Sequence, residues 1–254
     1  MASKHRPPAW REPSSPLLPP RADRITVWRI PLEVAPALLS RCAGILGKDE
    51  RQRADRFHFS RDQRRFVASH YALRMILSAY LGIPANQLRF TSGPYGKPTL
   101  DVDTQAPVVH FSLSHAHEMA LIAVAAGAVG IDLEYHDATA VYDDFITSFC
   151  SPRELPAAVG HPERALIYWT CKEAYLKGLG TGCAVSPATL EVFPSPMDVA
   201  RTGIAGDTEW SVCPFAPASA YHAAVAARGC DWNAEYVDWP VSWYPGARGC
   251  PLSA

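Results

Sequence analysis

The amino-acid sequence predicts an α+β protein made of two similar halves. The expected elements are a strand, a long helix and several strands, followed by a second long helix and further strands. The chain has 254 residues, of which 48% are hydrophobic and 19% charged, so it is long enough to bury a core without disulfide bonds. Proline-rich stretches flank this body at both ends. We therefore expect the two halves to meet near residues 126–130.

The first half is assigned to residues 24–126 and follows a disordered, proline-rich arm at 1–23. Six prolines within the first twenty residues disfavour helix and sheet in this arm. A long helix is expected at 61–81, because apolar side chains such as Phe66 and Leu73 recur on one face. Gly82 and Pro84 end it. Strands are expected at 25–32, 87–91, 108–113 and 119–125.

The second half is assigned to residues 127–230. A long helix is expected at 163–179, because two glycines close behind it provide a C-terminal stop signal. The proline and glycine content beyond residue 239 predicts that 231–254 is an irregular tail. Strands are expected at 129–134, 189–193, 209–214 and 222–227.

Charge, hydropathy and cysteine usage exclude several classes of protein. The net charge of −1 argues against a wholly basic nucleic-acid binder. No apolar run reaches the ~18 residues of a membrane span, and the N-terminus lacks the apolar segment of a secretory signal. The seven cysteines include no Cys-x-x-Cys pair, which argues against a secreted disulfide framework. We therefore expect a cytoplasmic protein that binds neither membrane nor nucleic acid.

Positive charge is concentrated between residues 41 and 74. This segment contains nine lysines and arginines against four acidic residues. Because guanidinium groups match phosphate oxygens, the segment is either a solvated helix face or an anion-binding site.

The stretch Gly130-Ile131-Asp132-Leu133-Glu134 places two carboxylates in an apolar strand. Because side chains alternate along a strand, Asp132 and Glu134 lie on one side and their apolar neighbours on the other. Paired carboxylates are costly in apolar surroundings unless a cation lies between them. Mg²⁺ is held by one or two carboxylates together with water and substrate phosphates. The stretch is therefore either a magnesium site or an exposed edge strand with two solvated acids.

The second expected helix carries Trp169, Glu173 and Lys177 at intervals of four residues, so they share one face. A surface pair of Glu173 with Lys177 would contribute only ~0.2–0.5 kcal/mol. However, the large apolar ring of Trp169 favours burial of this face. Glu173 is then a candidate third metal ligand or base, and Lys177 could reach a phosphate.

Two further segments carry groups that can bind phosphate. In the Gly-Lys-Pro turn at 96–98, glycine lets the backbone approach a ligand and Lys97 adds positive charge, although a plain loop would look the same. Ser114 and His115 end an expected strand, where both side chains can donate hydrogen bonds. His115 and His117 could instead be structural or bind zinc, but the Asp-His that follows such His-x-His motifs in binuclear hydrolases is missing.

Taken together, the four motifs resemble those of the Sfp-type (surfactin-type) 4′-phosphopantetheinyl transferases. That family's signature runs Gly-Lys-Pro, Phe-Asn-x-Ser-His, Gly-Ile-Asp-x-Glu and Trp-x-x-Lys-Glu-Ala/Ser-Phe/Tyr-x-Lys. This chain has, in the same order, Gly96-Lys97-Pro98, Phe111-Ser112-Leu113-Ser114-His115, Gly130 to Glu134 and Trp169 to Lys177. The resemblance covers residues 48 to 190. It departs from the pattern at Ser112, where the family has Asn, and at Ala116, where Ser is frequent.

The resemblance implies a fold, a reaction and partners. The fold would be a pseudo-dimer of two similar α/β halves with the active site and coenzyme A in the cleft between them, acting as a monomer. The reaction would be the Mg²⁺-dependent transfer of 4′-phosphopantetheine from coenzyme A to a serine of an apo acyl or peptidyl carrier protein, releasing adenosine 3′,5′-bisphosphate. Such carriers serve fatty-acid, polyketide or nonribosomal-peptide synthesis.

The resemblance also implies roles for individual residues. The expected metal ligands are Asp132, Glu134 and Glu173, with Glu173 as the candidate base. Lys177 would contact the diphosphate of coenzyme A. The remaining coenzyme A site would comprise Arg53, Arg65, Lys97, Pro98, Ser114 and His115. The region around Glu154 corresponds to the part of the family that receives the carrier protein.

Two other functions remain open at this point. A non-catalytic module that binds coenzyme A or a nucleotide would keep Arg53, Lys97 and Lys177 but would not need three carboxylates. A zinc-dependent hydrolase would be built around His115 and His117.

Overall fold

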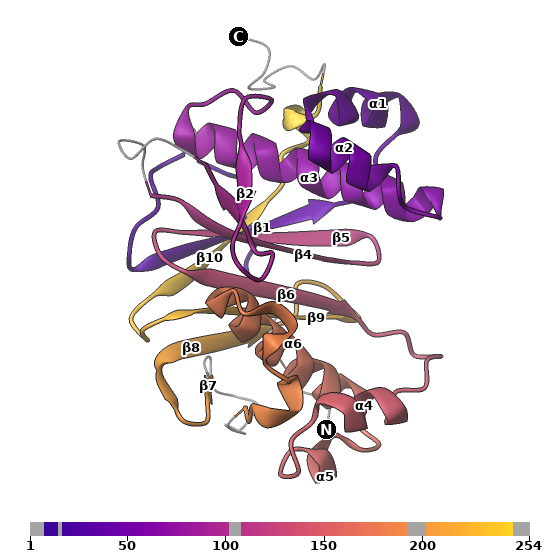
Figure 1. Cartoon of the computed structure of the whole chain (residues 1–254), viewed down its shortest axis with the longest axis vertical. Coiled ribbons are helices and arrows are strands. Elements are labelled where there is room, and N and C mark those ends of the chain that lie inside the picture. Colours follow the sequence, from indigo (N-terminus) through magenta and orange to yellow (C-terminus); the bar gives the residue numbers. More distant parts are fainter. Residues whose placement is uncertain (1–7, 15–16, 102–107, 193–201, 246–254) are drawn as a thin grey trace.

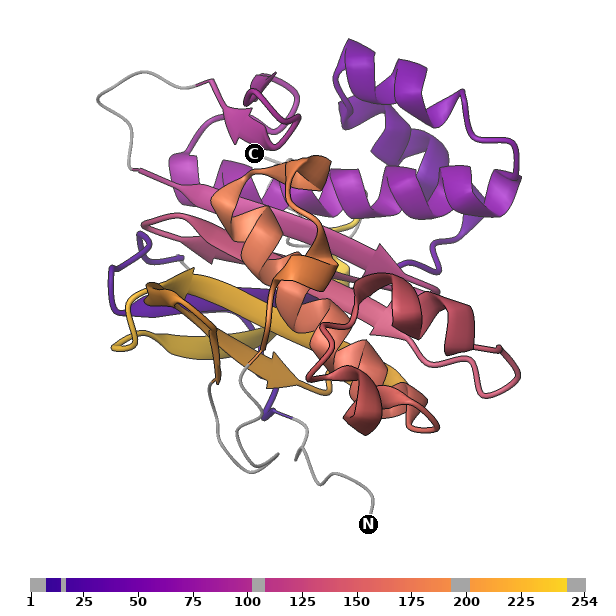
Figure 2. The ribbon, with the colours of Figure 1, turned by 60° about the horizontal axis from the view of Figure 1, so that its bottom comes forward.

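The computed structural model describes residues 8–14, 17–101, 108–192 and 202–245. Two β-sheets lie against each other in the middle of the molecule, and helices cover the outer face of each (Figures 1 and 2). The element order mixes hairpins and helices without a regular alternation, which agrees with the predicted α+β class.

The first sheet has the strand order β10-β1-β5-β4. The last strand of the chain pairs in parallel with the first, and the other neighbours are antiparallel. Its strands are β1 (Arg24–Pro31), β4 (His110–Ala116), β5 (Met119–Ala125) and β10 (Asn233–Asp238). A separate hairpin consists of β2 (Phe90–Ser92) and β3 (Pro98–Leu100).

The second sheet is antiparallel, with the order β6-β9-β8-β7. Its strands are β6 (Val129–Tyr135), β7 (Thr202–Ile204), β8 (Asp207–Phe215) and β9 (Tyr221–Arg228).

Each sheet is covered by one long helix that ends at a left-handed glycine. Helix α3 (Ser60–Leu81) stops at Gly82, with φ of 67°, and α6 (Pro162–Leu179) stops at Gly180, with φ of 72°. Glycine adopts this conformation without a Cβ clash. The shorter helices are α1 (Pro36–Ile45), α2 (Lys48–Ala54), α4 (Asp143–Phe149) and α5 (Leu155–Ala158), and single 3₁₀ turns are η1 (Gly182–Ala184), η2 (Pro187–Thr189) and η3 (Val241–Trp243). None of the described helices combines the length and apolar character needed to cross a lipid bilayer.

Three apolar cores hold the layers together, one under α3, one under α6 and one between the sheets. Strand β5 contributes to two of them, because Ile122 belongs to the core under α3 and Leu121 to the core between the sheets. In β6, Ile131 and Leu133 fill the core between the sheets. The alternate residues Asp132 and Glu134 therefore lie on the side of α6, which confirms the predicted alternation.

Both long helices and most of the expected strands form close to their predicted positions, but three predictions are wrong. The expected strand at 189–193 is a 3₁₀ turn followed by an isolated bridge at Val192, and residue 193 lies outside the described residues. The tail expected to be irregular at 231–254 contains β10, since its strand-forming residues find a partner in β1. In the arm at 1–23, Trp10 packs against Tyr236 and Arg11 bridges to Val237, so this described part is not disordered.

Candidate active site

Two glycines bring helix α6 into direct contact with strand β6. A Cβ atom on Gly130 would lie 1.9 Å from the Ala174 carbonyl oxygen and 2.3 Å from the Gly178 nitrogen. A Cβ atom on Gly178 would lie 2.4 Å from the Trp210 ring. Only glycine can therefore occupy these positions without moving the helix away from the strand. This close approach sets the acidic residues of β6 beside the polar face of α6.

Asp132 is the most buried acid of this cluster and contacts Lys177 and Ser114. The Lys177 ammonium group donates to Asp132 Oδ1 at 2.5 Å and to the Ser114 hydroxyl oxygen at 3.0 Å, while that hydroxyl donates to Asp132 Oδ1 at 2.9 Å. The other carboxylate oxygen, Oδ2, is buried and has no hydrogen-bond partner among the described residues. A buried carboxylate oxygen without a donor is a candidate ligand for a cation.

Glu134 accepts a hydrogen bond from the Trp169 indole nitrogen at 2.9 Å. The indole ring is itself held between Phe145 and Phe149, with ring centres 5.1 Å away in each case. Burial, followed by the neighbouring charge of Asp132, raises the pKa of Glu134 to about 7. The aromatic cluster therefore fixes one oxygen of a carboxylate that titrates near neutral pH.

Glu173 is half-buried and completes the group of acids. Burial and then the charge of Asp132 raise its pKa, while Lys177, one helical turn further on, opposes this shift. The three carboxylates thus interact electrostatically. Within the described ranges, however, they do not form a ready-made three-residue metal site, and neither do any other His, Cys, Asp or Glu side chains.

An open cavity of about 910 Å³ adjoins this cluster. Glu173, Lys177 and Trp169 line it from α6, and Arg53, Lys97 and His115 line it from the first half of the chain. Its volume lies within the ~300–1,000 Å³ typical of small-molecule sites. The cavity is therefore large enough for a cofactor-sized ligand beside the acids.

Lys97 lies on the cavity wall, but its ammonium group is already engaged. It donates to the backbone carbonyls of Val129 and Gly178, at 3.0 Å each. Burial lowers its pKa to about 8. In this structure Lys97 joins the start of β6 to the end of α6, which differs from the predicted free phosphate contact.

Arg53 and His115 are the predicted phosphate-binding residues that face the cavity without a described ion pair. The Arg53 guanidinium lies 5.4 Å from the Phe66 ring centre. Loss of hydration, followed by the positive charges of Lys177, Arg65 and Arg53, lowers the pKa of His115. Arg53 therefore supplies positive charge to this wall, and the uncharged His115 ring can donate a hydrogen bond to an anion there.

The remaining predicted residues fall into two groups. Pro98 lines the cavity, whereas Ser114 lies behind Lys177 against Asp132. Arg65 does not line this cavity, and its guanidinium lies 3.9 Å from carboxylate oxygens of Asp62 and Glu118. The structure thus brings Pro98 and Ser114 to the site but leaves Arg65 at its margin.

The structure brings two residues to the cavity whose place there the sequence did not predict. His70 and Phe66 line the cavity and extend into an adjoining hollow of about 510 Å³. Their rings stack with centres 3.7 Å apart, and burial lowers the pKa of His70 to about 3. The helical spacing placed both residues on the first long helix, but only the tertiary structure shows that they reach a cavity.

Glu154 is a buried side chain whose carboxylate faces the interior, so it is not itself available to a carrier protein, and docking at the surrounding region stays a prediction. One of its oxygens accepts from the Lys172 ammonium at 2.5 Å and from the Ser151 nitrogen at 2.8 Å. The other accepts from the Val192 nitrogen at 2.7 Å. All of its acceptors face inward, and only 3% of the residue is exposed.

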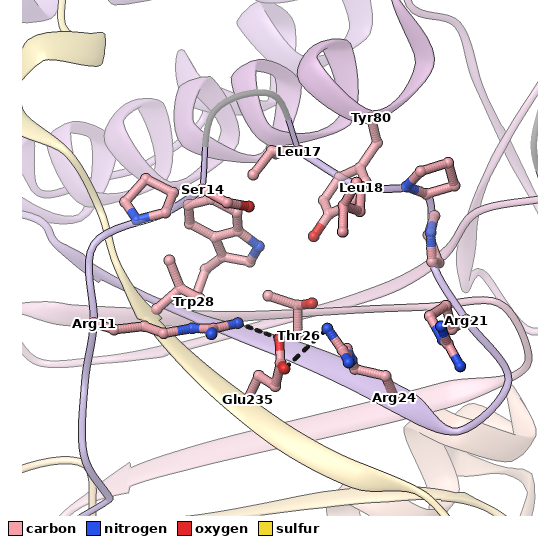
Figure 3. Close-up of a pocket in the computed structure, with 14 residues that line it drawn as sticks. Arg11, Ser14, Leu17, Leu18, Arg21, Arg24, Thr26, Trp28, Tyr80 and Glu235 are labelled. Carbon is pink, nitrogen blue, oxygen red and sulfur yellow. Dashed lines mark hydrogen bonds and ion pairs between the residues drawn. The ribbon is translucent and has the colours of Figure 1, made fainter.

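A smaller pocket lies where the N-terminal arm crosses the first sheet (Figure 3). Arg11 and Arg24 both pair with the Glu235 carboxylate on its floor, beneath Trp28 and Tyr80. Its volume of about 50 Å³ is far below the ~300 Å³ of small-molecule sites. We assign this pocket to the packing of the arm.

Comparison with known proteins identifies the family. A model of the N-terminal region of 4′-phosphopantetheinyl transferases matches residues 35–127, and a model of the 4′-phosphopantetheinyl transferase superfamily matches residues 128–226. The 4′-phosphopantetheinyl transferase HetI of Nostoc sp. is 36% identical over 230 residues, which cover 88% of this chain and 96% of that protein. The chain belongs to the 4′-phosphopantetheinyl transferase superfamily. The resemblance predicted from the four motifs is thereby confirmed.

Two other relatives of this transferase come from Bacillus. The 4′-phosphopantetheinyl transferase psf-1 of Bacillus pumilus is 28% identical over 196 residues, covering 70% of this chain and 82% of that protein. The transferase Sfp of Bacillus subtilis is 24% identical over 150 residues, covering 57% and 65%. The Gly-Lys-Pro and Ser-His motifs of this transferase fall in the first matched region, and its Gly-Ile-Asp-x-Glu and helical motifs fall in the second.

Proposed function

We propose that this transferase moves the 4′-phosphopantetheine group of coenzyme A to a serine hydroxyl of an apo carrier protein and releases adenosine 3′,5′-bisphosphate. The observation that carries the proposal is the cavity of about 910 Å³, which Glu173 of the acidic cluster lines on one side and Arg53 and Lys97 line on the other. A diphosphate ester needs both, because cationic groups bind its charge and acidic groups can hold a metal ion or accept a proton. Membership of the family supplies the reaction class.

The proposed active site lies between two similar halves. Arg53 and His115 reach the cavity from the first sheet and its helices, whereas Glu173 and Lys177 reach it from α6 on the second sheet. Each half has a sheet of four strands and one long covering helix. This arrangement supports a pseudo-dimer with its site in the cleft.

The acidic cluster fits a hard divalent cation such as Mg²⁺. Its donors are carboxylate oxygens, which Mg²⁺ prefers, and Asp132 Oδ2 is buried without a described donor. We assign Asp132, Glu134 and Glu173 as the residues that would hold the ion. Bound there, Mg²⁺ supplies positive charge that offsets the negative charge developing on the leaving group.

The residues of the chain itself bind the substrate and move one proton. Lys177 extends from α6 into the cavity, where its ammonium group can bind the diphosphate. Arg53 and His115 provide the further contacts to phosphate, in agreement with the absence of a described ion pair on Arg53. Trp169 holds Glu134 in place through its indole nitrogen.

Glu173 is the proposed base. In the metal-free site, burial and then the charge of Asp132 raise its pKa, which makes it a better proton acceptor than an ordinary carboxylate, and a metal ion bound beside it would oppose this shift. The serine oxygen forms a bond to the phosphorus atom that carries the pantetheine, the bond from this phosphorus to the bridging oxygen breaks, and the serine proton passes to Glu173. The leaving group is then adenosine 3′,5′-bisphosphate, so atoms and charge balance.

Neither alternative function accounts for these observations as well. His117 stacks on Tyr135 with ring centres 4.5 Å apart, and no third described ligand joins it and His115 in a zinc-like cluster. A module that only binds coenzyme A would not need the three interacting carboxylates beside the diphosphate. The acidic cluster therefore favours the transferase.

Intact-mass analysis of an apo carrier protein incubated with coenzyme A, Mg²⁺ and this protein tests the proposal. The carrier should gain one phosphopantetheine group. Asp132→Asn should slow this gain by about a hundredfold or more, because the carboxylate supports several kcal/mol of charge stabilisation. The exposed Asp231→Asn is the matched control and should leave the rate unchanged. Near wild-type modification by Asp132→Asn would refute the metal-site assignment.

A further inference from the structure

Lys177 occupies the place in the acidic cluster that a cation would otherwise fill. We propose that its ammonium group is an exchangeable stand-in for the metal ion: it neutralises Asp132 in the free enzyme and moves to the diphosphate when metal and coenzyme A bind. This inference rests on the proposed function and deepens it. It makes Lys177 a competitor of the metal before substrate binds and a ligand of the substrate afterwards.

The contacts of Lys177 in the structure support the first state. Its ammonium lies 2.5 Å from Asp132 Oδ1, and only 4% of the Asp132 side chain is exposed. A carboxylate this buried requires a charged or hydrogen-bonded partner, because removal from water otherwise costs several kcal/mol. Glu134 and Glu173 add negative charge beside it, which the Lys177 ammonium partly offsets. The lysine therefore balances a site that would otherwise carry three mutually repelling acids.

The position of Lys177 supports the second state. A third of its side chain, 33%, is exposed, and it lines the cavity near the end of α6. Its long side chain can reorient within that open space without moving the helix, because lysine has four rotatable side-chain bonds. Ser114 remains as a donor to Asp132 Oδ1 when the ammonium leaves. The exchange thus needs only one side chain to move.

The exchange predicts a specific coupling between metal and coenzyme A. Without coenzyme A, the metal must displace or tolerate a competing positive charge at Asp132, so its binding is weakened. With coenzyme A, the diphosphate offers the ammonium a new partner, and the metal binds more tightly. By linkage, the metal strengthens the binding of coenzyme A by the same factor.

Mn²⁺ binding followed by electron paramagnetic resonance, with and without coenzyme A, tests this coupling directly. Lys177→Met keeps an unbranched side chain of similar length and removes the charge. It should bind Mn²⁺ about tenfold more tightly than wild type when coenzyme A is absent, because an adjacent like charge is removed. Added coenzyme A should also increase the Mn²⁺ affinity of Lys177→Met by a smaller factor than it does for wild type. Arg53→Gln is the matched control: it removes a cation from the same cavity that has no described ion pair, and should leave Mn²⁺ affinity without coenzyme A unchanged.

Three results distinguish the possible failures. If Lys177→Met binds Mn²⁺ no more tightly than wild type, Lys177 does not compete at Asp132 and the inference is wrong. If it binds more tightly by the same factor with and without coenzyme A, Lys177 stays on Asp132 throughout and does not exchange. If Asp132→Asn binds Mn²⁺ as well as wild type, the metal-site assignment of the proposed function fails instead. A Lys177→Met protein that folds only when Mn²⁺ is added would support the stand-in role, since the ion would then replace the missing charge.

Discussion

Replacing Gly130 with alanine tests the close contact that assembles the acidic site. The added Cβ atom would lie 1.9 Å from the carbonyl oxygen of Ala174, which is 1.5 Å less than the 3.4 Å at which ordinary contact begins. The nearest atoms all belong to the backbone of α6, so no side-chain rotation can relieve the clash. Helix α6 must therefore move away from β6 by an amount of this size, carrying Glu173 with it.

Two consequences of this displacement can be given a magnitude. Overpacking of this kind costs about 1–3 kcal/mol in the free energy of unfolding. A displacement of about 1 Å at a reacting group can also slow a reaction by ~10²-fold. We therefore expect Gly130→Ala to be moderately destabilised and to lose far more activity than stability.

Urea unfolding and the initial rate of carrier modification measure the two effects separately. Gly127→Ala is the matched control, because an added Cβ atom there would meet nothing within 4 Å. The control should retain both the free energy of unfolding and the rate of wild type. If Gly130→Ala behaves like Gly127→Ala in both assays, the argument that glycine sets the spacing of β6 and α6 is refuted.

Two further predictions concern buried groups outside the acidic cluster. Lys172→Met should lower the free energy of unfolding in urea by about 3–5 kcal/mol, because it leaves the buried Glu154 charge unpaired. The double variant with Glu154→Gln should recover part of this loss. No loss of stability in Lys172→Met would contradict the buried ion pair. Burial lowers the pKa of His70 in the folded protein to about 3. As the pH falls, the imidazole of the unfolded chain is therefore protonated before that of the folded protein. The contribution of His70 to stability is complete above pH ~6.5 and is lost as the pH falls toward 3. His70→Gln should therefore lose less in Tm between pH 7 and pH 5 than wild type, and an equal loss would show that His70 does not contribute.

The elements that carry the acidic site were predictable from local patterns. Successive side chains of a strand point to opposite faces, so Ile131 of β6 lies in the core and Asp132 lies on the opposite side. The interval of four residues likewise places Trp169 and Glu173 on one face of α6. Such patterns depend only on residues close together in sequence, so tertiary contacts do not alter them.

The features that the sequence did not predict depend on distant parts of the chain. In the sequence, Lys97 lies in a polar turn and looks like an unpaired cation. The carbonyl groups that accept its hydrogen bonds belong to the distant residues Val129 and Gly178. Lys172 lies next to the predicted base and resembles a surface charge, yet its partner Glu154 comes from the segment before the helix. The competition of Lys177 with a metal ion at Asp132 is likewise visible only once β6 and α6 are placed together.

The parallel pairing of β10 with β1 constrains how this enzyme is made. Register partners Arg24 and Asn233 are separated by 209 positions, so β1 keeps an open edge until the chain up to β10 has left the ribosome. An unpaired edge can pair with another chain, and contacts this remote in sequence form slowly. The nascent first half is therefore most prone to aggregation during translation. A chain truncated before residue 233 would lack β10, so the edge of β1 would stay open and aggregation-prone.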